Sequence, residues 1–369
     1  MTVARVLVDL LFYTGSKGGM ESYVERLYSA FPRNTGLEFT GLVSREAEKL
    51  DLSWFPGETV PSGVPGENRV RWAAGELLAV PRAARTAGAH LIHSPANVGP
   101  ARSRVPLVLT VHDLLPFVHP EWVPGRRSAA IRWLIRRASR AASRVITVSE
   151  ASGADIRTVL AVRSERIDVL PLAGRPAGTP AIPVGTVPAE EPPLVLLIGN
   201  RMPHKNGETL LRALAALPAD SRPRLAVTGG STSGDPLRAL AEELGITASV
   251  DFAGWVSPSE LGDLFERSSI VAVPSRFEGF GLPVLEAMSR GRAVLCSDLP
   301  VLREVASDAA LYVPADDPAA WARGLRALLD DPSARASLAA RGLRRSAGFS
   351  WETTAERTAE VFHRVLKSA

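Results

Sequence analysis

Two glutamates, Glu278 and Glu286, bracket a glycine-containing turn and are the first candidates for chemistry. The turn follows the apolar run 270–273 and precedes a predicted helix over about 282–290. Backbone N–H groups at the start of a helix attract phosphate, and here they belong to Gly281 and the residues after it. On spacing alone a functional site and a plain turn are equally supported, because the helix dipole by itself favours a nearby glutamate.

A second group of candidates is basic. Arg201 and Lys205 follow the apolar run 194–198. A departing diphosphate develops negative charge, and fixed cations stabilise that charge. The alternative is a solvated basic turn, which is the usual environment of arginine and lysine. Asn206, the next residue along, is expected to cap the following helix.

The sequence has no Asp-x-Asp pattern, and no histidines and cysteines with the spacing of metal ligands. Side chains and a helix start would therefore have to neutralise a bound diphosphate. We expect no metal site in this chain.

Polar residues also follow apolar runs in the first half of the chain. Gly18 and Gly19 come after the first run, where glycines let a ligand approach the backbone, although alone they indicate a plain turn. His112 and Asp113 follow the run 107–111. A lone histidine after a strand is usually structural, but its place at a strand end makes His112 a candidate for ligand contact.

Trp255 and Val256 follow a predicted strand at 250–252. They are candidates for contact with a nucleobase, and a tryptophan packed at a domain edge is an equal alternative. The next residues, Ser257 to Glu260, form a predicted capping box that starts a helix.

The segment from Arg126 to Arg144 predicts an amphipathic helix that is rich in arginine. Apolar residues share one face, and the opposite face carries Trp133 with Arg132, Arg136, Arg137, Arg140 and Arg144. Such a face can rest on anionic lipid. A solvated surface helix is the more common outcome.

The elements that position these residues are short apolar runs alternating with longer amphipathic stretches. Near-continuous apolar strands between helices indicate parallel sheets covered on both faces, and the pattern occurs twice. We therefore predict two doubly wound α/β domains, whose ligands bind beyond the carboxyl ends of the strands. The predicted strands are 3–9, 39–43, 90–93, 107–111, 145–148, 167–170, 194–198, 224–227, 250–252, 270–273, 293–296 and 310–313.

The totals agree with a folded protein of two domains. The chain has 369 residues, of which 46% are apolar and 22% charged. A single cysteine, Cys296, excludes an internal disulfide and fits a reducing, cytoplasmic compartment. No long apolar run or signal peptide is recognised, and a dispersed net charge of +4 does not favour nucleic acid.

The run from Glu278 to Glu286 matches the two-glutamate signature of retaining glycosyltransferases with the GT-B fold, in particular glycosyltransferase family 4. The resemblance extends over nearly the whole chain. It includes the Gly18-Gly19 loop, His112-Asp113, Val148-Ser149-Glu150, Lys205 and the helix that begins near Trp351.

The resemblance implies two Rossmann-like domains that face a central cleft. The first, 1–172, would hold the acceptor, and a final helix at about 352–369 would cross back to it. A proline- and glycine-rich linker, 173–193, would lead to a nucleotide-sugar-binding domain at 194–350.

The resemblance also implies roles for the candidates. His112 and Glu278 would act on the sugar at the catalytic centre, and Asp113 and Tyr13 would lie on the acceptor side. The donor-binding residues would be Gly18, Gly19, Arg201, Lys205, Val256, Phe280, Gly281, Leu282 and Glu286.

The expected reaction moves a hexosyl or deoxyhexosyl group from a GDP-, dTDP- or UDP-linked donor to a hydroxyl of a small molecule, a glycan or a lipid-linked glycan. The nucleotide sugar is a substrate, so no cofactor is expected. Peripheral membrane contact through Arg126 to Arg144 would place the enzyme at the inner face of a membrane. Two alternatives are another nucleotide-sugar enzyme of this fold, such as a phosphorylase or an epimerase, and a non-catalytic nucleotide-sugar-binding subunit.

Overall fold

The computed structural model describes most of the chain, namely residues 3–16, 18–174, 192–230 and 234–368. The chain divides into two compact units: Met1–Leu172 with Ser350–Ala369, and Ala173–Phe349. The predicted linker lies outside the described residues over 175–191.

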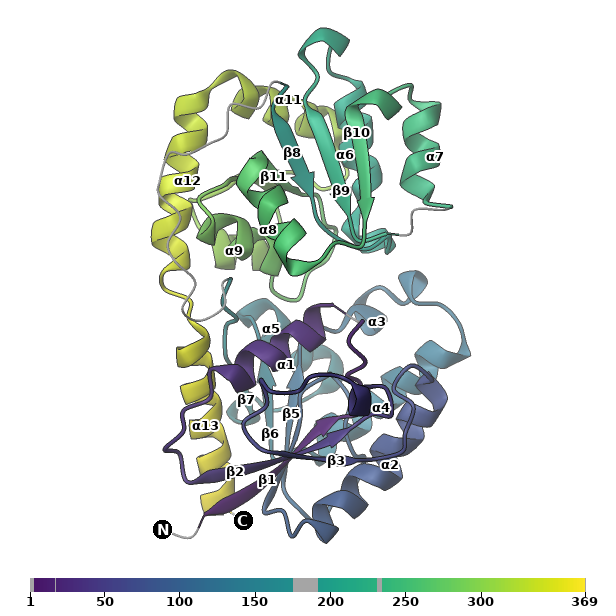
Figure 1. The fold of residues 1–369 in the computed structure, drawn as a ribbon, viewed down its shortest axis with the longest axis vertical. Coiled ribbons are helices and arrows are strands. Elements are labelled where there is room, and N and C mark those ends of the chain that lie inside the picture. The colour runs from purple at the N-terminus through teal and green to yellow at the C-terminus, as the bar shows by residue number, and fades with distance from the viewer. Residues whose placement is uncertain (1–2, 17, 175–191, 231–233, 369) are drawn as a thin grey trace. The chain divides into compact units, whose positions relative to one another are not determined.

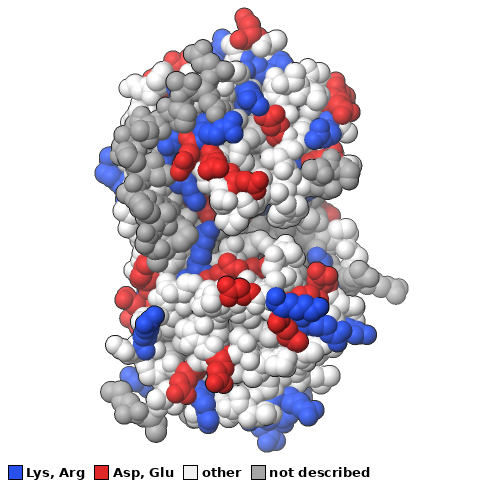
Figure 2. Space-filling view, in the orientation of Figure 1, with Lys and Arg blue, Asp and Glu red and all other residues white. Residues whose placement is uncertain are grey.

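Each unit is built on one parallel sheet with helices on both faces, which confirms the doubly wound α/β class (Figure 1). Basic and acidic side chains are interspersed over the face that Figure 2 shows.

The sheet of the first unit has seven parallel strands in the order β3-β2-β1-β4-β5-β6-β7. Its central strands are buried on both faces, as apolar runs between helices require. Strand β3 was missing from the prediction, because its sequence Glu-Thr-Val-Pro is half polar and lies at the sheet edge. The strands are β1 (Ala4–Leu10), β2 (Leu37–Val43), β3 (Glu58–Pro61), β4 (Leu91–Ser94), β5 (Leu107–Val111), β6 (Arg144–Thr147) and β7 (Ile167–Val169).

The helices of the first unit cover the two faces of this sheet. Apolar side chains of α2, α4 and α5 join one buried cluster with the strands. Figure 1 shows α1 and α13 lying along the sheet as well. The helices before the last are α1 (Gly19–Ser29), α2 (Arg69–Thr86), α3 (Leu115–Val118), α4 (Arg126–Ala141) and α5 (Glu150–Leu160).

The last helix, α13 (Trp351–Ser368), packs in the first unit although it follows the second in sequence. The Trp351 ring lies 6.1 Å from the Tyr23 ring, and the Phe362 ring stacks 6.1 Å from that of Phe31. The Thr354 hydroxyl donates to the Pro171 carbonyl over 2.7 Å. Aromatic packing and this hydrogen bond together fix the helix on the unit.

The sheet of the second unit has six parallel strands in the order β10-β9-β8-β11-β12-β13. Strands β8 and β11 are direct neighbours at its centre. The strands are β8 (Leu194–Leu197), β9 (Arg224–Thr228), β10 (Val250–Gly254), β11 (Ser268–Val273), β12 (Ala293–Ser297) and β13 (Leu311–Val313).

Helices cover both faces of this sheet too. The buried Trp321 on α11 joins α6 and α7 in one apolar cluster, and α9 packs on α12 and β12 on the other side. The helices are α6 (Gly207–Ala215), α7 (Pro236–Glu243), α8 (Pro258–Arg267), α9 (Leu282–Ser289), α10 (Pro300–Ala306), α11 (Pro318–Asp330) and α12 (Pro332–Ser346).

The predicted basic helix ends earlier than the sequence suggested. Helix α4 stops at Ala141, and Arg144 belongs to β6, where it binds Asp168. Arg144 therefore does not share the exposed face of α4, which is a correction to the predicted arginine face. Within the described residues, no helix is long and apolar enough to cross a bilayer.

Candidate active site

Lys205 and Glu278 meet at the carboxyl end of the second sheet. Lys205 ends a short 3₁₀ turn (Pro203–Lys205) after β8, and Glu278 lies in the loop after β11. Because β8 and β11 are adjacent and parallel, the loops that follow them emerge side by side. The Lys205 Nζ donates to Glu278 Oε1 over 2.7 Å.

Glu278 is held in its ionised form. Its Oε1 also accepts a hydrogen bond from the Ser275 hydroxyl over 2.7 Å. Burial alone would raise the pKa of Glu278, but the charge of Lys205 and the hydrogen bonds from Lys205 and Ser275 lower it below its ordinary value. The loop therefore carries a fixed negative charge beside a fixed positive charge at neutral pH.

Asn206 ties the turn that carries Lys205 to the loops that follow β11 and β13. Its backbone is left-handed, with φ 53°, and its side-chain amide donates to the carbonyls of Pro274 and Ala315 over 3.0 and 2.8 Å. The predicted helix cap is wrong in one respect, because the Asn206 side chain accepts from the Thr209 hydroxyl rather than from a backbone N–H of α6. The buried amide fixes Lys205 relative to the loop that carries Glu278.

Helix α9 begins beside this pair, as the sequence predicted to within a residue. Gly281 precedes it with φ 96°, and a Cβ there would lie 2.4 Å from Leu302 Cδ2, so only glycine fits. Leu282 opens the helix, and Glu286 lies within it, 7% exposed. The Phe280 side chain is buried and packs edge-on against Phe349, with ring centroids 6.1 Å apart.

Arg201 binds a carboxylate. Its Nε lies 2.8 and 2.9 Å from the Asp235 carboxylate oxygens, and its Nη1 donates to the carbonyls of Gly199 and Thr228. Asp235 is fully buried and also caps α7 by accepting from Leu237 N–H. Arg201 thus holds together the ends of β8 and β9 and the start of α7, and its contact with a diphosphate stays a prediction.

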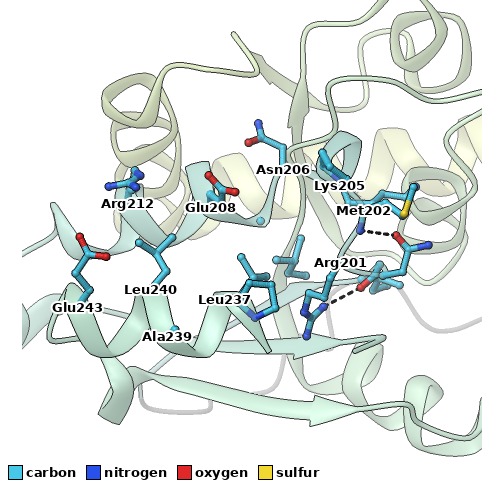
Figure 3. A pocket seen from close by; sticks show the side chains of 17 residues that line it. Arg201, Met202, Lys205, Asn206, Glu208, Arg212, Leu237, Ala239, Leu240 and Glu243 are labelled. Carbon is cyan, nitrogen blue, oxygen red and sulfur yellow. Dashed lines mark hydrogen bonds between the residues drawn. The ribbon is translucent and has the colours of Figure 1, made fainter. Parts of the chain in front are cut away.

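A cavity of about 310 Å³ adjoins the same turn. Figure 3 shows that α6, α7 and the 199–206 turn surround it. Arg201 and Lys205 line one end, and Glu208, Arg212 and Glu243 line the other. The turn that carries the basic candidates therefore borders an open volume.

Val256 is partly buried in the short link between β10 and α8, beside Trp255, which is 69% exposed. The predicted capping box is confirmed, since the Ser257 hydroxyl accepts from Glu260 N–H and the Glu260 carboxylate accepts from Ser257 N–H.

His112 in the first unit is a buried, neutral imidazole. Its Nε2 lies 2.8 Å from the Pro95 carbonyl, so Nε2 carries the proton and Nδ1 keeps its lone pair. Burial lowers its pKa to about 4. The Asn97 side chain accepts from His112 N–H over 2.6 Å, and the Ser152 hydroxyl donates to His112 C=O over 3.1 Å.

The acceptor-side candidates have structural contacts. Asp113 Oδ1 accepts from Leu115 N–H over 2.9 Å and so holds the start of α3. The Tyr13 hydroxyl donates to Glu25, and its ring lies 5.4 Å from that of Trp54. Burial, followed by the hydrogen bond and charge of Glu25, raises the pKa of Tyr13.

Gly18 and Gly19 form the start of α1. Gly18 has φ 69°, and its carbonyl accepts from the N–H groups of Glu21 and Ser22. A Cβ at either glycine would meet nothing within 4 Å. The start of α1 therefore has open space beside both glycines. The buried Glu21 carboxylate accepts a hydrogen bond from Thr14.

Three residues of the site were not predicted from the sequence. Ser275 stands three positions before Glu278 and could have been found from the motif. Asp235 and Asn97 could not, because each acts through a partner on another loop that the sequence does not identify. In the described part of the chain, no three His, Cys, Asp or Glu side chains gather as metal ligands would.

Two family descriptions match the chain, one for each half. "Glycosyl transferases group 1" matches residues 180–345, and "Glycosyltransferase Family 4" matches residues 17–173. Together the two matched ranges contain every site candidate except Tyr13.

Curated relatives agree with these families. The D-inositol 3-phosphate glycosyltransferase of Kineococcus radiotolerans is 32% identical, over 96% of this chain and 92% of that protein. The O-antigen chain mannosyltransferase B of Escherichia coli is 31% identical, over 69% of each chain.

Among solved structures, sucrose-phosphate synthase from Thermosynechococcus elongatus has a TM-score of 0.80 and 20% identity, over 99% of this chain and 100% of that one. At this identity the likeness concerns the fold alone. It agrees with the two parallel sheets seen here, and the expected GT-B architecture is confirmed. The chain belongs to the group 1, family 4 glycosyltransferases and is an enzyme that transfers a sugar.

Proposed function

We propose that the enzyme transfers a hexosyl or deoxyhexosyl group from a nucleotide-diphosphate sugar to a hydroxyl acceptor, with retention at the anomeric carbon and without a metal. The Lys205–Glu278 pair at the carboxyl ends of β8 and β11 carries this proposal. In this proposal the cation faces the leaving diphosphate, and the carboxylate faces the sugar ring as that ring develops positive charge.

In this proposal Lys205 binds the diphosphate and keeps its hydrogen bond to Glu278. An ammonium group has three donors, and the structure uses one of them for Glu278 Oε1. The remaining donors, together with the backbone N–H groups near Gly281 and Leu282, serve the phosphate oxygens. Glu286, buried in α9, accepts hydrogen bonds from the ribose hydroxyls.

Glu278 stabilises the transition state electrostatically. As the bond between the anomeric carbon and the diphosphate oxygen breaks, the ring gains oxocarbenium character. A carboxylate that is already ionised and oriented by Lys205 and Ser275 stabilises that charge at little reorganisation cost. The acceptor oxygen attacks from the face that the diphosphate leaves, and its proton passes to a departing phosphate oxygen.

His112 contributes a hydrogen-bond acceptor to the sugar. Its proton is committed to the Pro95 carbonyl, so a sugar hydroxyl can donate to Nδ1. Hydrogen bonds between its backbone and the side chains of Asn97 and Ser152 fix the position of the ring before substrate binds.

The donor nucleotide is GDP-, dTDP- or UDP-linked, and a mannosyl group is favoured by similarity to a relative named as a mannosyltransferase. Thermal unfolding with GDP, dTDP and UDP tests this, because the cognate nucleotide raises Tm by mass action. Product analysis by NMR with added EDTA then tests both the anomeric configuration and the need for a metal. An inverted product, or activity lost to EDTA and restored by Mg²⁺, refutes the corresponding part.

A lipid-linked or membrane-proximal acceptor is favoured by α4. On its outer side Trp133 is 52% exposed and Arg136 and Arg140 face solvent, while Leu134 and Ile135 are buried on the other side. The Arg137 guanidinium lies 5.8 Å from the Trp133 ring, so cation and aromatic ring form one patch. We propose that this patch brings the enzyme peripherally to an anionic membrane surface.

A further inference from the structure

A second cavity lies at the opposite end of the first sheet from His112. It has a volume of about 620 Å³. Pro106, Ser143 and Arg166 line it, and they immediately precede β5, β6 and β7. His112 follows the carboxyl end of β5, so the cavity is separate from the candidate residues of this unit.

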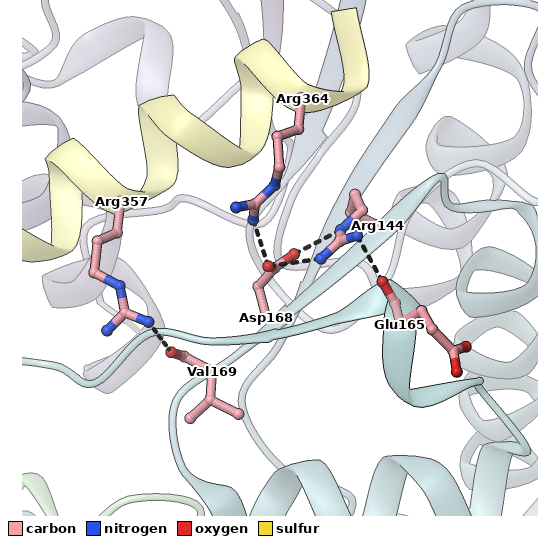
Figure 4. Close-up of polar contacts among 6 residues, drawn as sticks. All are labelled: Arg144, Glu165, Asp168, Val169, Arg357 and Arg364. Carbon is pink, nitrogen blue, oxygen red and sulfur yellow. Dashed lines mark hydrogen bonds and ion pairs between the residues drawn. The ribbon is translucent and has the colours of Figure 1, made fainter. Parts of the chain in front are cut away.

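The cavity is strongly basic. Four of its lining side chains are cations: Arg144, Arg166, Arg364 and Lys367. None of its lining residues is acidic. Two of these cations, Arg144 and Arg364, form ion pairs with the same carboxylate, that of Asp168 (Figure 4).

One carboxylate does not balance these charges. Asp168 accepts two hydrogen bonds from Arg144, each of 2.7 Å, and a further one from Arg364. Glu165 contributes its backbone carbonyl to Arg144, and Figure 4 shows its carboxylate pointing away from that guanidinium. The two arginines thus share one negative charge and are held in place by it.

Arg166 and Lys367 add charge that is not paired with any carboxylate in the described part of the chain. The Arg166 guanidinium donates to the carbonyls of Ser139, Arg140 and Ala142 at the end of α4. Burial, followed by the positive charges of Arg163 and Arg144, lowers the pKa of Arg166. Among the described residues, the Lys367 side chain has no hydrogen-bond or ion-pair partner.

We propose that this cavity binds a multiply charged anion that carries phosphate groups. Guanidinium groups held by carbonyls and by Asp168 provide a fixed array of donors, which suits the geometry of phosphate oxygens. Lys367, on the last turn of α13, supplies a mobile point charge that can close on the ligand. A cation or a neutral apolar ligand would leave the excess positive charge uncompensated.

Binding would also strengthen the attachment of α13. Arg364 and Lys367 belong to this helix, whereas Arg144 and Arg166 belong to the sheet side of the cavity. An anion that contacts both groups joins the C-terminal helix to the strands by charge. The expected ligand is either a free phosphate compound or the phosphate of a lipid headgroup, since both present the same oxygens.

Thermal unfolding with sodium pyrophosphate tests the proposal, with sodium chloride at equal ionic strength as the reference. Pyrophosphate can also bind beside Lys205, so all proteins carry Lys205→Ala. We expect pyrophosphate to raise Tm in this background. We expect the additional change Lys367→Glu to weaken pyrophosphate binding by at least about tenfold in calorimetry, because it removes one charge-assisted contact and adds repulsion.

Arg357→Ala is the matched control. Arg357 lies on the same helix and donates to the Val169 carbonyl, but it does not line the cavity (Figure 4). It should leave pyrophosphate affinity unchanged. Lys367→Ala serves as a second variant if Lys367→Glu unfolds, and it should weaken binding in the same direction.

Vesicles distinguish the two sources of phosphate. Binding of pyrophosphate alone identifies a soluble ligand, and binding of phosphatidic acid vesicles that Lys367→Glu weakens identifies a headgroup. Either result supports the cavity. The proposal is overturned if neither probe binds in the Lys205→Ala background, or if Lys367→Glu binds both probes as well as Arg357→Ala does.

Discussion

The Lys205 ammonium lies 2.7 Å from Glu278 Oε1, although the two residues are 73 positions apart in the chain. The pairing of β8 with β11 brings them together, since Leu197 and Ala272 are opposite each other near the strand ends. Their side chains are only 20% and 10% exposed. They therefore act as one oriented pair, and a change at either residue alters the other.

Glu278→Gln should lower turnover by about 10²- to 10³-fold, because it removes a preorganised charge that stabilises the transition state. Glutamine keeps the shape and can still accept a hydrogen bond from Lys205, so the circular dichroism spectrum should not change. Initial rates with saturating donor measure the effect. Glu242→Gln, at an exposed glutamate of α7 that does not line the cavity, is the control and should behave like wild type. Wild-type turnover in Glu278→Gln would remove this carboxylate from the mechanism.

Lys205→Met should destabilise the second unit by about 1–3 kcal/mol, because it leaves a largely buried carboxylate without its cation. The double variant Lys205→Met/Glu278→Gln should recover part of that loss. Urea unfolding at neutral pH measures both values. If the loss of unfolding free energy in the double variant equals the sum of the losses in the two single variants, Lys205 and Glu278 are not energetically coupled.

Much of the fold could be predicted because buried parallel strands produce apolar runs that are easily recognised. Strands β5, β8 and β11 follow that pattern. Strand β3 does not, since an edge strand is exposed and tolerates proline and charge. The end of α4 was misplaced because Arg144 continues the arginine spacing while its backbone has already entered β6.

The site was predictable where neighbouring strands determine it. Lys205 and Glu278 each follow a strand, and the adjacency of those strands brings them together. The partner of Arg201 was not predictable, because Asp235 lies on a different loop and nothing in its sequence surroundings marks an ion pair. The same holds for Asn97, whose left-handed backbone at φ 65° directs its side chain to His112 N–H.

His112 should stay neutral throughout the physiological range. Its pKa is about 4 in the folded protein, below the ordinary value of 6.5, because the ring is buried. Protonation of His112 should therefore not change turnover between pH 8 and pH 6. His112→Ala should lower turnover by about 10- to 100-fold at every pH in that range. A pH–rate profile of both proteins checks this. A loss of wild-type activity near pH 6.5 that His112→Ala abolishes would contradict a neutral role.

The buried histidines should also make the first unit sensitive to acid. His93 bonds to the Tyr28 and Thr110 hydroxyls, and burial lowers its pKa to about 3. The unfolded chain takes up protons at these histidines below pH 6.5 while the folded chain does not, so stability falls as pH drops. Each histidine contributes at most about 1.4 kcal/mol per pH unit. His93→Gln should reduce this slope in urea unfolding between pH 6.5 and pH 4.

Glu76→Gln should stabilise the first unit, and more so at pH 8 than at pH 5. Burial and the neighbouring Asp9 carboxylate raise the pKa of Glu76, so the folded protein keeps a proton that the unfolded chain releases above the ordinary value of 4.5. That difference costs stability increasingly as pH rises. Glutamine keeps an acceptor for Trp72 Nε1, which now bonds to Glu76 over 2.6 Å, and needs no proton. Equal Tm differences between variant and wild type at pH 5 and pH 8 would contradict a protonated Glu76.

Arg136→Ala/Arg140→Ala should weaken binding to anionic vesicles by about 2 kcal/mol, or roughly 30-fold, because each basic residue near such a surface contributes about 1 kcal/mol. Both arginines are exposed on α4, beside Trp133. Trp133→Ala should weaken binding further by removing the ring that enters the interface. Co-sedimentation at physiological salt measures the affinities, and Arg323→Ala, at an exposed arginine of the second unit, is the control. Equal binding of wild type to neutral and anionic vesicles would show that charge on α4 does not direct the enzyme to a membrane.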